Sequence, residues 1–228
     1  MVQMGKSKSS GDPSMESFIE QTVMEAARDM LSGARKSHAW DHTLRVLATA
    51  SRIGEAEGAD VLAVRLAALL HDVGRPLEDE SHGAVCHAKI GAKLAGKVLA
   101  GLNLDEGRRK NILHSIETHR YRGNGAPETL EAKVLFDADK LDSIGAVGIA
   151  RAFQFAGEVG ARLHNPDTAP ELTEAYSADD TGFREYSLKL RFIKDRMLTQ
   201  TGRSMAKERH AFMDEFFRRF CDEYSALI

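Results

Sequence analysis

The chain has 228 residues, of which 43% are hydrophobic and 29% charged, a composition typical of a globular protein with a sizeable core. Its formal net charge of −3 lacks the basic excess of proteins that bind nucleic acid polymers, so such a partner is not expected. No run of about 18 apolar residues occurs, which argues against a membrane span. Two distant cysteines, Cys86 and Cys221, predict reduced thiols in a cytoplasmic protein.

Helical periodicity dominates the chain after a Gly-, Ser- and Lys-rich leader, residues 1–13, which we expect to be disordered. The Asp12-Pro13 pair is a helix start signal, and the apolar spacing predicts a first helix that ends near Gly33. Asn103, with Glu106 three residues later, predicts another start. The further helices are expected over Trp40–Gly58, Asp60–His71, Cys86–Leu99, Asn103–His119, Thr129–Leu141, Ser143–Gly157, Phe183–Thr201 and Ser204–Ser225. Because alternating strand patterns are almost absent, the sequence predicts one all-α domain over residues 14–228.

One segment, residues 162–182, interrupts this helical pattern. It is polar and carries two of the five prolines. We interpret it as a surface excursion or a lid of the same domain rather than as a linker.

Several histidines and aspartates stand where the chain otherwise turns inward. His71 and Asp72 follow the apolar run of the stretch AALLHDVGRP, His42 lies on an amphipathic helix, and Asp139 follows another apolar run. Burying an ionised carboxylate costs several kcal/mol unless it is compensated. A divalent metal would compensate all of them, because two imidazoles and two carboxylates balance its charge and leave about two of six positions open.

The ordered set of His42, His71-Asp72 and Asp139 resembles the HD-domain superfamily of metal-dependent phosphohydrolases, and AALLHDVG resembles its central motif. The segment DADKLDSIGAVGIARAF resembles a narrower bacterial branch, whose members often read DADRLDALGAIGIAR and include nucleotide pyrophosphohydrolases. The C-terminal segment LRFIKDRMLTQTGRSMAKERHAFMDEFFRRF also resembles that branch. The resemblance runs from about Ser37 to the C-terminus. It implies an HD-type helical bundle in which His42, His71, Asp72 and Asp139 bind the metal.

The choice of Asp139 as the fourth ligand also comes from the resemblance. The superfamily ligand directly precedes a basic-Leu pair, here Lys140-Leu141, whereas Asp137 and Asp142 flank it. Asp137 stays open as an alternative ligand.

Two further histidines, His87 in HAKIGA and His119 in IETHRYRG, occupy settings that hold a second ion in two-metal branches of the superfamily. Three roles stay open for them: binding of such an ion, contact with the substrate phosphate, or a plain position at the surface. Because Arg120 follows His119 and would repel a second ion, we expect one tightly bound divalent ion (Mn, Fe, Co, Ni or Mg). His87 and His119 then join Asp72 as catalytic residues. Three other histidines lack such settings and are predicted to be surface residues: His114, His164 and His210.

Basic residues near the motifs are candidate phosphate contacts, although a solvated surface charge is an equal alternative for each. They are Arg45, Arg75, Arg120, Arg122 and Lys140. Arg75 stands where alarmone-hydrolysing members carry a glutamate, which disfavours that activity and leaves the general acid or base unassigned. Glu78, Asp79 and Glu80 follow in a predicted loop and are the candidates.

The resemblance thus predicts a metal-dependent phosphohydrolase acting on a soluble nucleotide. The preferred reaction is attack by metal-activated water that converts a nucleoside triphosphate into monophosphate and pyrophosphate. A di-iron oxygen-activating enzyme and a non-catalytic metal or nucleotide sensor are the alternatives. The expected partner is a small-molecule nucleotide, without nucleic acid polymer or membrane, and formation of a homodimer stays open.

Overall fold

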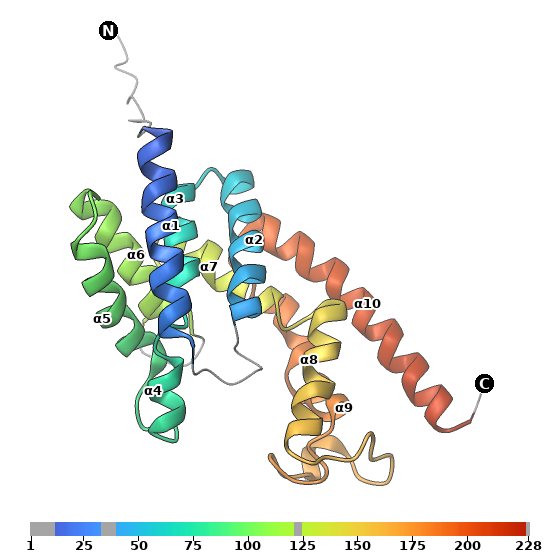
Figure 1. Ribbon diagram of the computed structural model, residues 1–228. Coiled ribbons are helices and arrows are strands. Elements are labelled where there is room, and N and C mark those ends of the chain that lie inside the picture. The colour runs from blue at the N-terminus through green and yellow to red at the C-terminus, as the bar shows by residue number, and fades with distance from the viewer. Residues whose placement is uncertain (1–11, 33–39, 121–124, 227–228) are drawn as a thin grey trace, which may run out of the picture.

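The computed structural model describes residues 12–32, 40–120 and 125–226, and every regular element in these ranges is a helix (Figure 1). The elements are α1 (Pro13–Met30), α2 (Trp40–Glu57), α3 (Val61–Leu70), α4 (Arg75–Glu80), α5 (His87–Ala100), α6 (Glu106–Thr118), α7 (Leu130–Leu141), α8 (Gly145–Glu158), η2 (Pro170–Leu172), α9 (Gly182–Leu188), η3 (Leu190–Arg196) and α10 (Gln200–Tyr224). The prediction of an all-α fold is confirmed for the described part of the chain. The predicted disordered leader falls largely on residues 1–11, which lie outside the described ranges, whereas Pro13 already opens α1.

Helix α3 forms the centre of the bundle. All of its residues except Val61 and Arg65 are buried, as expected of a helix that is apolar on nearly every side. It packs against α1, α2, α6 and α7, and Figure 1 shows α3 enclosed among these helices. The chain that leaves the end of α3 therefore starts inside the protein, and this places His71 and Asp72 in the interior.

The predicted start of α6 at Asn103 is wrong. The helix begins at Glu106, and its N-cap is Asp105, whose carboxylate accepts a hydrogen bond from the Arg108 backbone N–H. Aspartate caps a helix about as well as asparagine, so the spacing alone did not distinguish the two residues.

The single helix predicted over residues 183–201 is also wrong. The chain leaves α9 at Lys189, where φ is −138° and ψ is −56°, and continues as the 3₁₀ helix η3. Helix α10 then starts at Gln200, four residues before the predicted Ser204, because the Thr199 side chain caps it by accepting from Gly202 N–H. Another difference is α4, since the sequence predicted a loop over this acidic segment.

The excursion over residues 162–182 is folded against α9. Arg184 of α9 donates hydrogen bonds to the Thr173 hydroxyl at 2.7 Å and to the Asp180 carboxylate at 2.9 Å. Asp180 is itself buried and accepts from the backbone N–H of Tyr176. These contacts fit a surface excursion of the same bundle, while its closure as a lid over bound nucleotide stays a prediction.

Among the described helices, none combines the length and the apolar character that crossing a bilayer would require.

Candidate metal centre

Four histidines surround the carboxylate of Asp72, which is 1% exposed. Asp72 Oδ2 lies 3.7 Å from His42 Nε2 and 3.6 Å from His71 Nε2. Its other oxygen, Oδ1, lies 3.3 Å from His87 Nε2 and 3.6 Å from His119 Nε2. The donor atoms thus form two groups that share Asp72, and within each group they lie no more than 4.8 Å apart.

Each of these histidines lies at a helix end. His42 is in the first turn of α2, His71 caps the C-terminus of α3, His87 opens α5, and His119 caps the C-terminus of α6. The site therefore depends on the convergence of four helix termini that are far apart in the sequence.

Two of the imidazoles are oriented by backbone carbonyls. His71 Nδ1 lies 2.8 Å from Ala68 O, and His119 Nδ1 lies 2.6 Å from Ile116 O. A carbonyl oxygen can only accept, so each Nδ1 carries the proton and donates it. The Nε2 lone pairs of both rings are then directed toward Asp72 and available to a metal.

The other two imidazoles are oriented by carboxylates. His42 Nδ1 lies 2.7 Å from Asp142 Oδ2, and His87 Nδ1 lies 2.6 Å from Glu78 Oε2. Sequence reasoning named Asp142 only as a neighbour of Asp139 and did not distinguish Glu78 from the acids that follow it. The helical i, i+3 spacing of Asp139 and Asp142 was the one signal that both could lie near the same site.

The two candidate aspartates of α7 face different surroundings. Asp139 Oδ1 lies 3.5 Å from His42 Nε2, at the edge of the centre. Asp137 instead accepts hydrogen bonds from the N–H groups of Leu198 and Thr199, each at 2.8 Å, and from the Thr199 hydroxyl at 2.6 Å. Asp139 thus lies next to His42 and its role as a ligand stays a prediction, whereas Asp137 anchors the start of α10.

Three of the predicted phosphate contacts lie beside the centre. Arg75 Nε is 3.1 Å from Asp72 Oδ1, Arg120 Nη1 is 2.6 Å from Glu78 Oε1, and Lys140 Nζ is 2.6 Å from Asp139 Oδ2. They place positive charge next to the proposed ligands.

A fourth predicted phosphate contact, Arg45, is engaged elsewhere. Its guanidinium pairs with Asp142 at 2.7 Å and with Asp41 of its own helix at 2.7 Å. In this arrangement it supports the carboxylate that holds His42. Arg122 falls outside the described residues.

Burial and neighbouring charges give the imidazoles of the centre different pKa values. Burial opposes the charged form of His42, but hydrogen bonds to Asp139 and Asp142 outweigh it and raise its pKa to about 9. Burial lowers the pKa of His71 to about 4 and that of His87 to about 3. For Asp139, burial is outweighed by Lys140 and His42, which hold its pKa well below the usual range. At neutral pH the metal-free centre therefore contains neutral His71 and His87 beside an ionised Asp139.

The donor set suits a divalent ion. Imidazole nitrogens and carboxylate oxygens converge on a buried volume, and no thiolate belongs to either group of donors. Mixed nitrogen and oxygen donors of this kind favour manganese, iron, cobalt, nickel or magnesium over ions that prefer sulfur.

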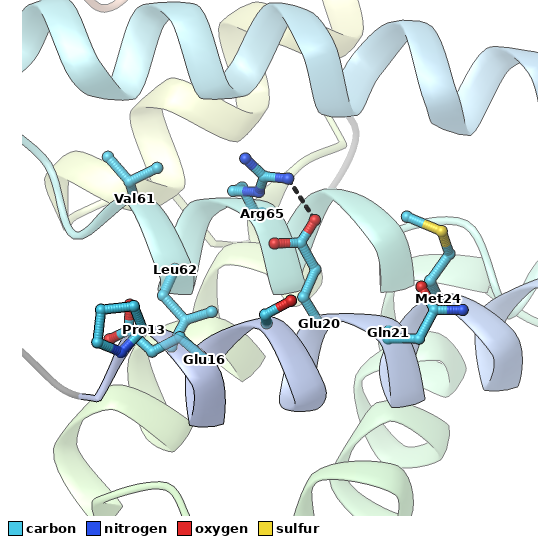
Figure 2. Close-up of a pocket in the computed structure, with 9 residues that line it drawn as sticks. Pro13, Glu16, Glu20, Gln21, Met24, Val61, Leu62 and Arg65 are labelled. Atoms are coloured by element: carbon cyan, nitrogen blue, oxygen red, sulfur yellow. Dashed lines mark hydrogen bonds and ion pairs between the residues drawn. The ribbon is translucent and has the colours of Figure 1, made fainter.

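A surface groove between α1 and α3 lies apart from this centre (Figure 2). Its wall contains the ion pair between Glu20 and Arg65, and no histidine is among the described residues that line it. The residues of α3 that line it belong to the first half of that helix, whereas His71 follows the last residue. The groove is therefore separate from the chemistry of the centre.

Comparison with known proteins identifies the family. A model of the HD domain matches residues 39–144, which include His42, His71, Asp72 and Asp139. The protein YpgQ of Bacillus subtilis is 35% identical over 196 residues, which cover 84% of this chain and 87% of YpgQ. The chain belongs to the HD-domain family. The HD-type bundle expected from the motifs is thereby confirmed.

Solved structures agree with this family assignment. The crystal structure of YpgQ in complex with ADP superposes with a TM-score of 0.71 at 30% identity, covering 92% of this chain and 96% of that one. An HD-superfamily hydrolase from Bacillus thuringiensis superposes with a TM-score of 0.74 at 28% identity, covering 92% and 99%. The chain thus shares its fold with a hydrolase of this superfamily over 92% of its length.

Ribonuclease Y proteins match this chain over a small part of their own length. The enzyme of Chloroflexus aurantiacus is 34% identical over 100 residues, which are 44% of this chain but 17% of the ribonuclease. The chain therefore spans about a sixth of that relative's length.

Two histidines predicted at the surface are buried instead. His164 is 6% exposed and lies among the rings of Phe183, Phe220 and Tyr224. His210 is 7% exposed, with Nε2 2.7 Å from Lys194 Nζ. Neither belongs to the groups of donor atoms around Asp72, because aromatic packing and α10 determine their positions.

Proposed function

We propose that this HD-domain protein is a metal-dependent phosphohydrolase acting on a soluble nucleotide. The observation that carries the proposal is the convergence of four imidazole Nε2 atoms on buried Asp72, with Arg75 directly beside it. A cation site bordered by fixed positive side chains suits a phosphoryl group, because the cation and the side chains can each bind its oxygens. The ADP in the crystal structure of YpgQ supports a nucleotide as the ligand.

His42, His71, Asp72 and Asp139 would hold one divalent ion (Mn, Fe, Co, Ni or Mg). When bound, such an ion lowers the pKa of water and polarises a phosphoryl oxygen. The protein orients three of these donors before the ion arrives, since Asp142 fixes His42, Ala68 O fixes His71, and the end of α3 fixes Asp72.

His87 and His119 would face the substrate phosphate. Because His87 Nδ1 donates to the Glu78 carboxylate, its Nε2 carries the lone pair and would accept a hydrogen bond from the attacking water. In the proposed reaction the oxygen of water bonds to phosphorus, the bond to the leaving pyrophosphate breaks, and the proton passes to solvent, since a pKa of about 3 keeps His87 neutral. Arg75, Arg120 and Lys140 would bind the phosphate oxygens, and Lys140 lies 3.5 Å from the His119 carbonyl.

A second metal ion is the alternative use of His87 and His119. These residues and Asp72 form a group of donor atoms as close as that of His42 and His71. Against a second ion, Arg75 Nε already lies 3.1 Å from the shared Asp72 Oδ1, and two cations at such distances repel by several kcal/mol. Metal stoichiometry with an iron absorption spectrum separates the one-ion hydrolase from a di-iron oxygen-activating enzyme.

The experiment that tests the function is a nucleotide panel with each divalent ion, in which phosphate and pyrophosphate release are measured separately. We expect pyrophosphate release from a nucleoside triphosphate by the wild-type protein and none by Asp72→Ala. Release of phosphate instead of pyrophosphate would show that a different phosphate bond of the nucleotide is cleaved. Metal binding without turnover of any nucleotide would favour the non-catalytic sensor. A cytoplasmic location, the absence of a nucleic acid polymer as partner, and a homodimer remain predictions.

A further inference from the structure

We propose that Asp142 is the positioning residue that holds His42 with Nε2 available to the metal. The proposal rests on the metal site of the proposed function and adds a residue outside the ligand set. A histidine that binds a metal through Nε2 keeps its proton on Nδ1, and a carboxylate that accepts from Nδ1 fixes both this tautomer and the ring orientation. Asp142 Oδ2 lies 2.7 Å from His42 Nδ1, 100 residues apart in sequence.

Two arginines hold the Asp142 carboxylate from two sides. Arg45 of α2 donates from Nε to Oδ1 at 2.7 Å and from Nη2 to Oδ2 at 3.0 Å. Arg151 of α8 donates from Nη1 to Oδ2 at 2.8 Å and to the Asp142 backbone carbonyl at 3.3 Å. The carboxylate side chain is 6% exposed. Bidentate pairing with Arg45 and the contact from Arg151 leave Asp142 one orientation, in which it faces His42.

His42 differs from His71 and His119 in the partner of its Nδ1. His71 and His119 each donate to a carbonyl three residues earlier in their own helix. His42 Nδ1 instead lies against Asp142, which stands at the C-cap of α7 and connects α2, α7 and α8 at the centre.

The same contacts give Arg45 a role. Arg45 lies three residues after His42 in α2, on the same face of the helix, and its guanidinium donates to the Asp142 carboxylate. Arg45 and Arg151 compensate the buried charge of Asp142, and they keep it from becoming a ligand that turns toward the ion. Asp142 thus acts through His42 and not by contact with the metal.

The test compares Asp142→Ala and Asp142→Asn with Asp137→Asn, a matched change of a buried aspartate in the same helix that faces Thr199. Mn²⁺ affinity is measured by calorimetry on folded protein. We expect Asp142→Ala to weaken Mn²⁺ binding about 10–100-fold, the range of losses of such supporting partners. Asp142→Asn should lose less, because an amide oxygen can still accept from His42, and Asp137→Asn should keep wild-type affinity while lowering the melting temperature.

A second measurement does not depend on metal loading. In ¹H–¹⁵N spectra of metal-free protein, the His42 Nδ1 proton should give a downfield, slowly exchanging signal, assigned by its loss in His42→Gln. This signal should persist in Asp137→Asn and disappear in Asp142→Ala. If Asp142→Ala does not fold, Asp142→Asn and Arg151→Gln carry the test, with a weakened signal and a smaller loss of affinity.

Wild-type Mn²⁺ affinity in the Asp142 variants, or an unchanged Nδ1 proton signal, overturns the positioning role. A failure of the proposed function would give a different result from a failure of the positioning role. If the wild-type protein binds no Mn²⁺, the metal site is wrong, and the Nδ1 signal alone then decides whether Asp142 holds His42.

Discussion

Asp72 is a buried carboxylate whose compensation comes from its neighbours. In the metal-free protein, Arg75 Nε lies 3.1 Å from one oxygen, and the raised pKa of His42 provides a second positive charge 3.7 Å from the other. An ionised carboxylate removed from water costs several kcal/mol unless such partners offset it. Positive charge on both sides thus offsets the burial of the Asp72 carboxylate.

Removing a proposed ligand should abolish tight metal binding. His71→Ala deletes a buried nitrogen donor, and Asp72→Ala deletes the oxygen donor that both groups of donor atoms share. Either change leaves too few ligands to replace the water around a divalent ion. Elemental analysis after dialysis measures the occupancy, with the exposed Lys110→Ala as control. Full occupancy in both variants would disprove the site.

His119→Ala should separate catalysis from metal binding. If one ion binds at His42 and His71, removal of His119 leaves its ligands intact, because His119 Nε2 faces the other oxygen of Asp72. We expect unchanged metal content and a rate lowered by about 10²–10⁴-fold, the usual contribution of a positioned acid–base group. Two ions per wild-type chain, with one lost in His119→Ala, would instead establish a dinuclear centre.

The pKa values of the imidazoles predict that the metal-free protein is most stable near pH 6.5–7. Below about pH 6.5 the unfolded chain protonates His71 and His87, whereas their folded pKa values are about 4 and 3, so stability falls as pH falls. Above pH 6.5 the unfolded chain loses the His42 proton that the folded state keeps up to about pH 9, so stability falls as pH rises.

Each proton taken up or released on unfolding changes the free energy of unfolding by about 1.4 kcal/mol per pH unit. Urea unfolding in EDTA between pH 5 and 9 measures this dependence. His71→Asn should make the acid limb shallower. A flat curve between pH 5 and 6.5 would show that the buried histidines are protonated in the folded protein.

At the scale of elements, the centre depends on the close packing of the turn after α3 against α5. A Cβ added to Gly74 would lie 2.3 Å from His87 O and 2.7 Å from Ile90 Cγ2. Only glycine permits this approach, which places the first residue of α5 beside Asp72.

Gly74→Ala should therefore displace the start of α5 and move His87 away from Asp72. We expect reduced stability, by about 1–3 kcal/mol as for overpacked sites, and a lower rate. The matched control is Gly101→Ala at the other end of α5, where an added Cβ meets nothing within 4 Å and φ is −83°. Thermal unfolding and nucleotide turnover measure both variants. Equal effects of the two changes would mean that the approach at Gly74 does not position His87.

Helix α7 shows how one element serves two purposes. Asp139 and Asp142 face the centre, whereas Asp137 accepts the N–H of Thr199 and its hydroxyl at the start of α10. Successive helical residues are about 100° apart, so residues 137 and 139 point in nearly opposite directions. The helix thus connects the metal centre to the C-terminal part of the bundle.

For the molecule as a whole, metal removal should lower the melting temperature. An ion that binds only the native state adds about 2.7 kcal/mol at one hundred times its dissociation constant. For a chain of this size that corresponds to roughly 5–10 °C. Calorimetry with Mn²⁺ and with EDTA measures the shift, and His71→Ala should show none. An equal shift in that variant would place the stabilising ion elsewhere.

Much of this molecule follows from its sequence. Helical periodicity and caps such as Asp12 and Thr129 depend on local interactions, so most helices lie close to their predicted bounds. The set of His42, His71-Asp72 and Asp139 stands out because polar residues after apolar runs need compensation, and the order of the motifs identified the family. The break between α9 and η3 did not follow, because packing at residues 189–199 overrides helical propensity there.

The tertiary structure alone decided which partner each site residue has. Periodicity assigns a residue to a face of its helix, but not the element that this face meets. The resemblance preferred Asp139 to Asp137 as a ligand, but only the folded chain gives Asp137 its partner, Thr199. Glu78 was separated from its acidic neighbours only by its hydrogen bond to His87. The pairing of His42 with Asp142 joins residues 100 positions apart. Such contacts form because buried charges must find partners once the helices pack, and that condition belongs to the folded chain.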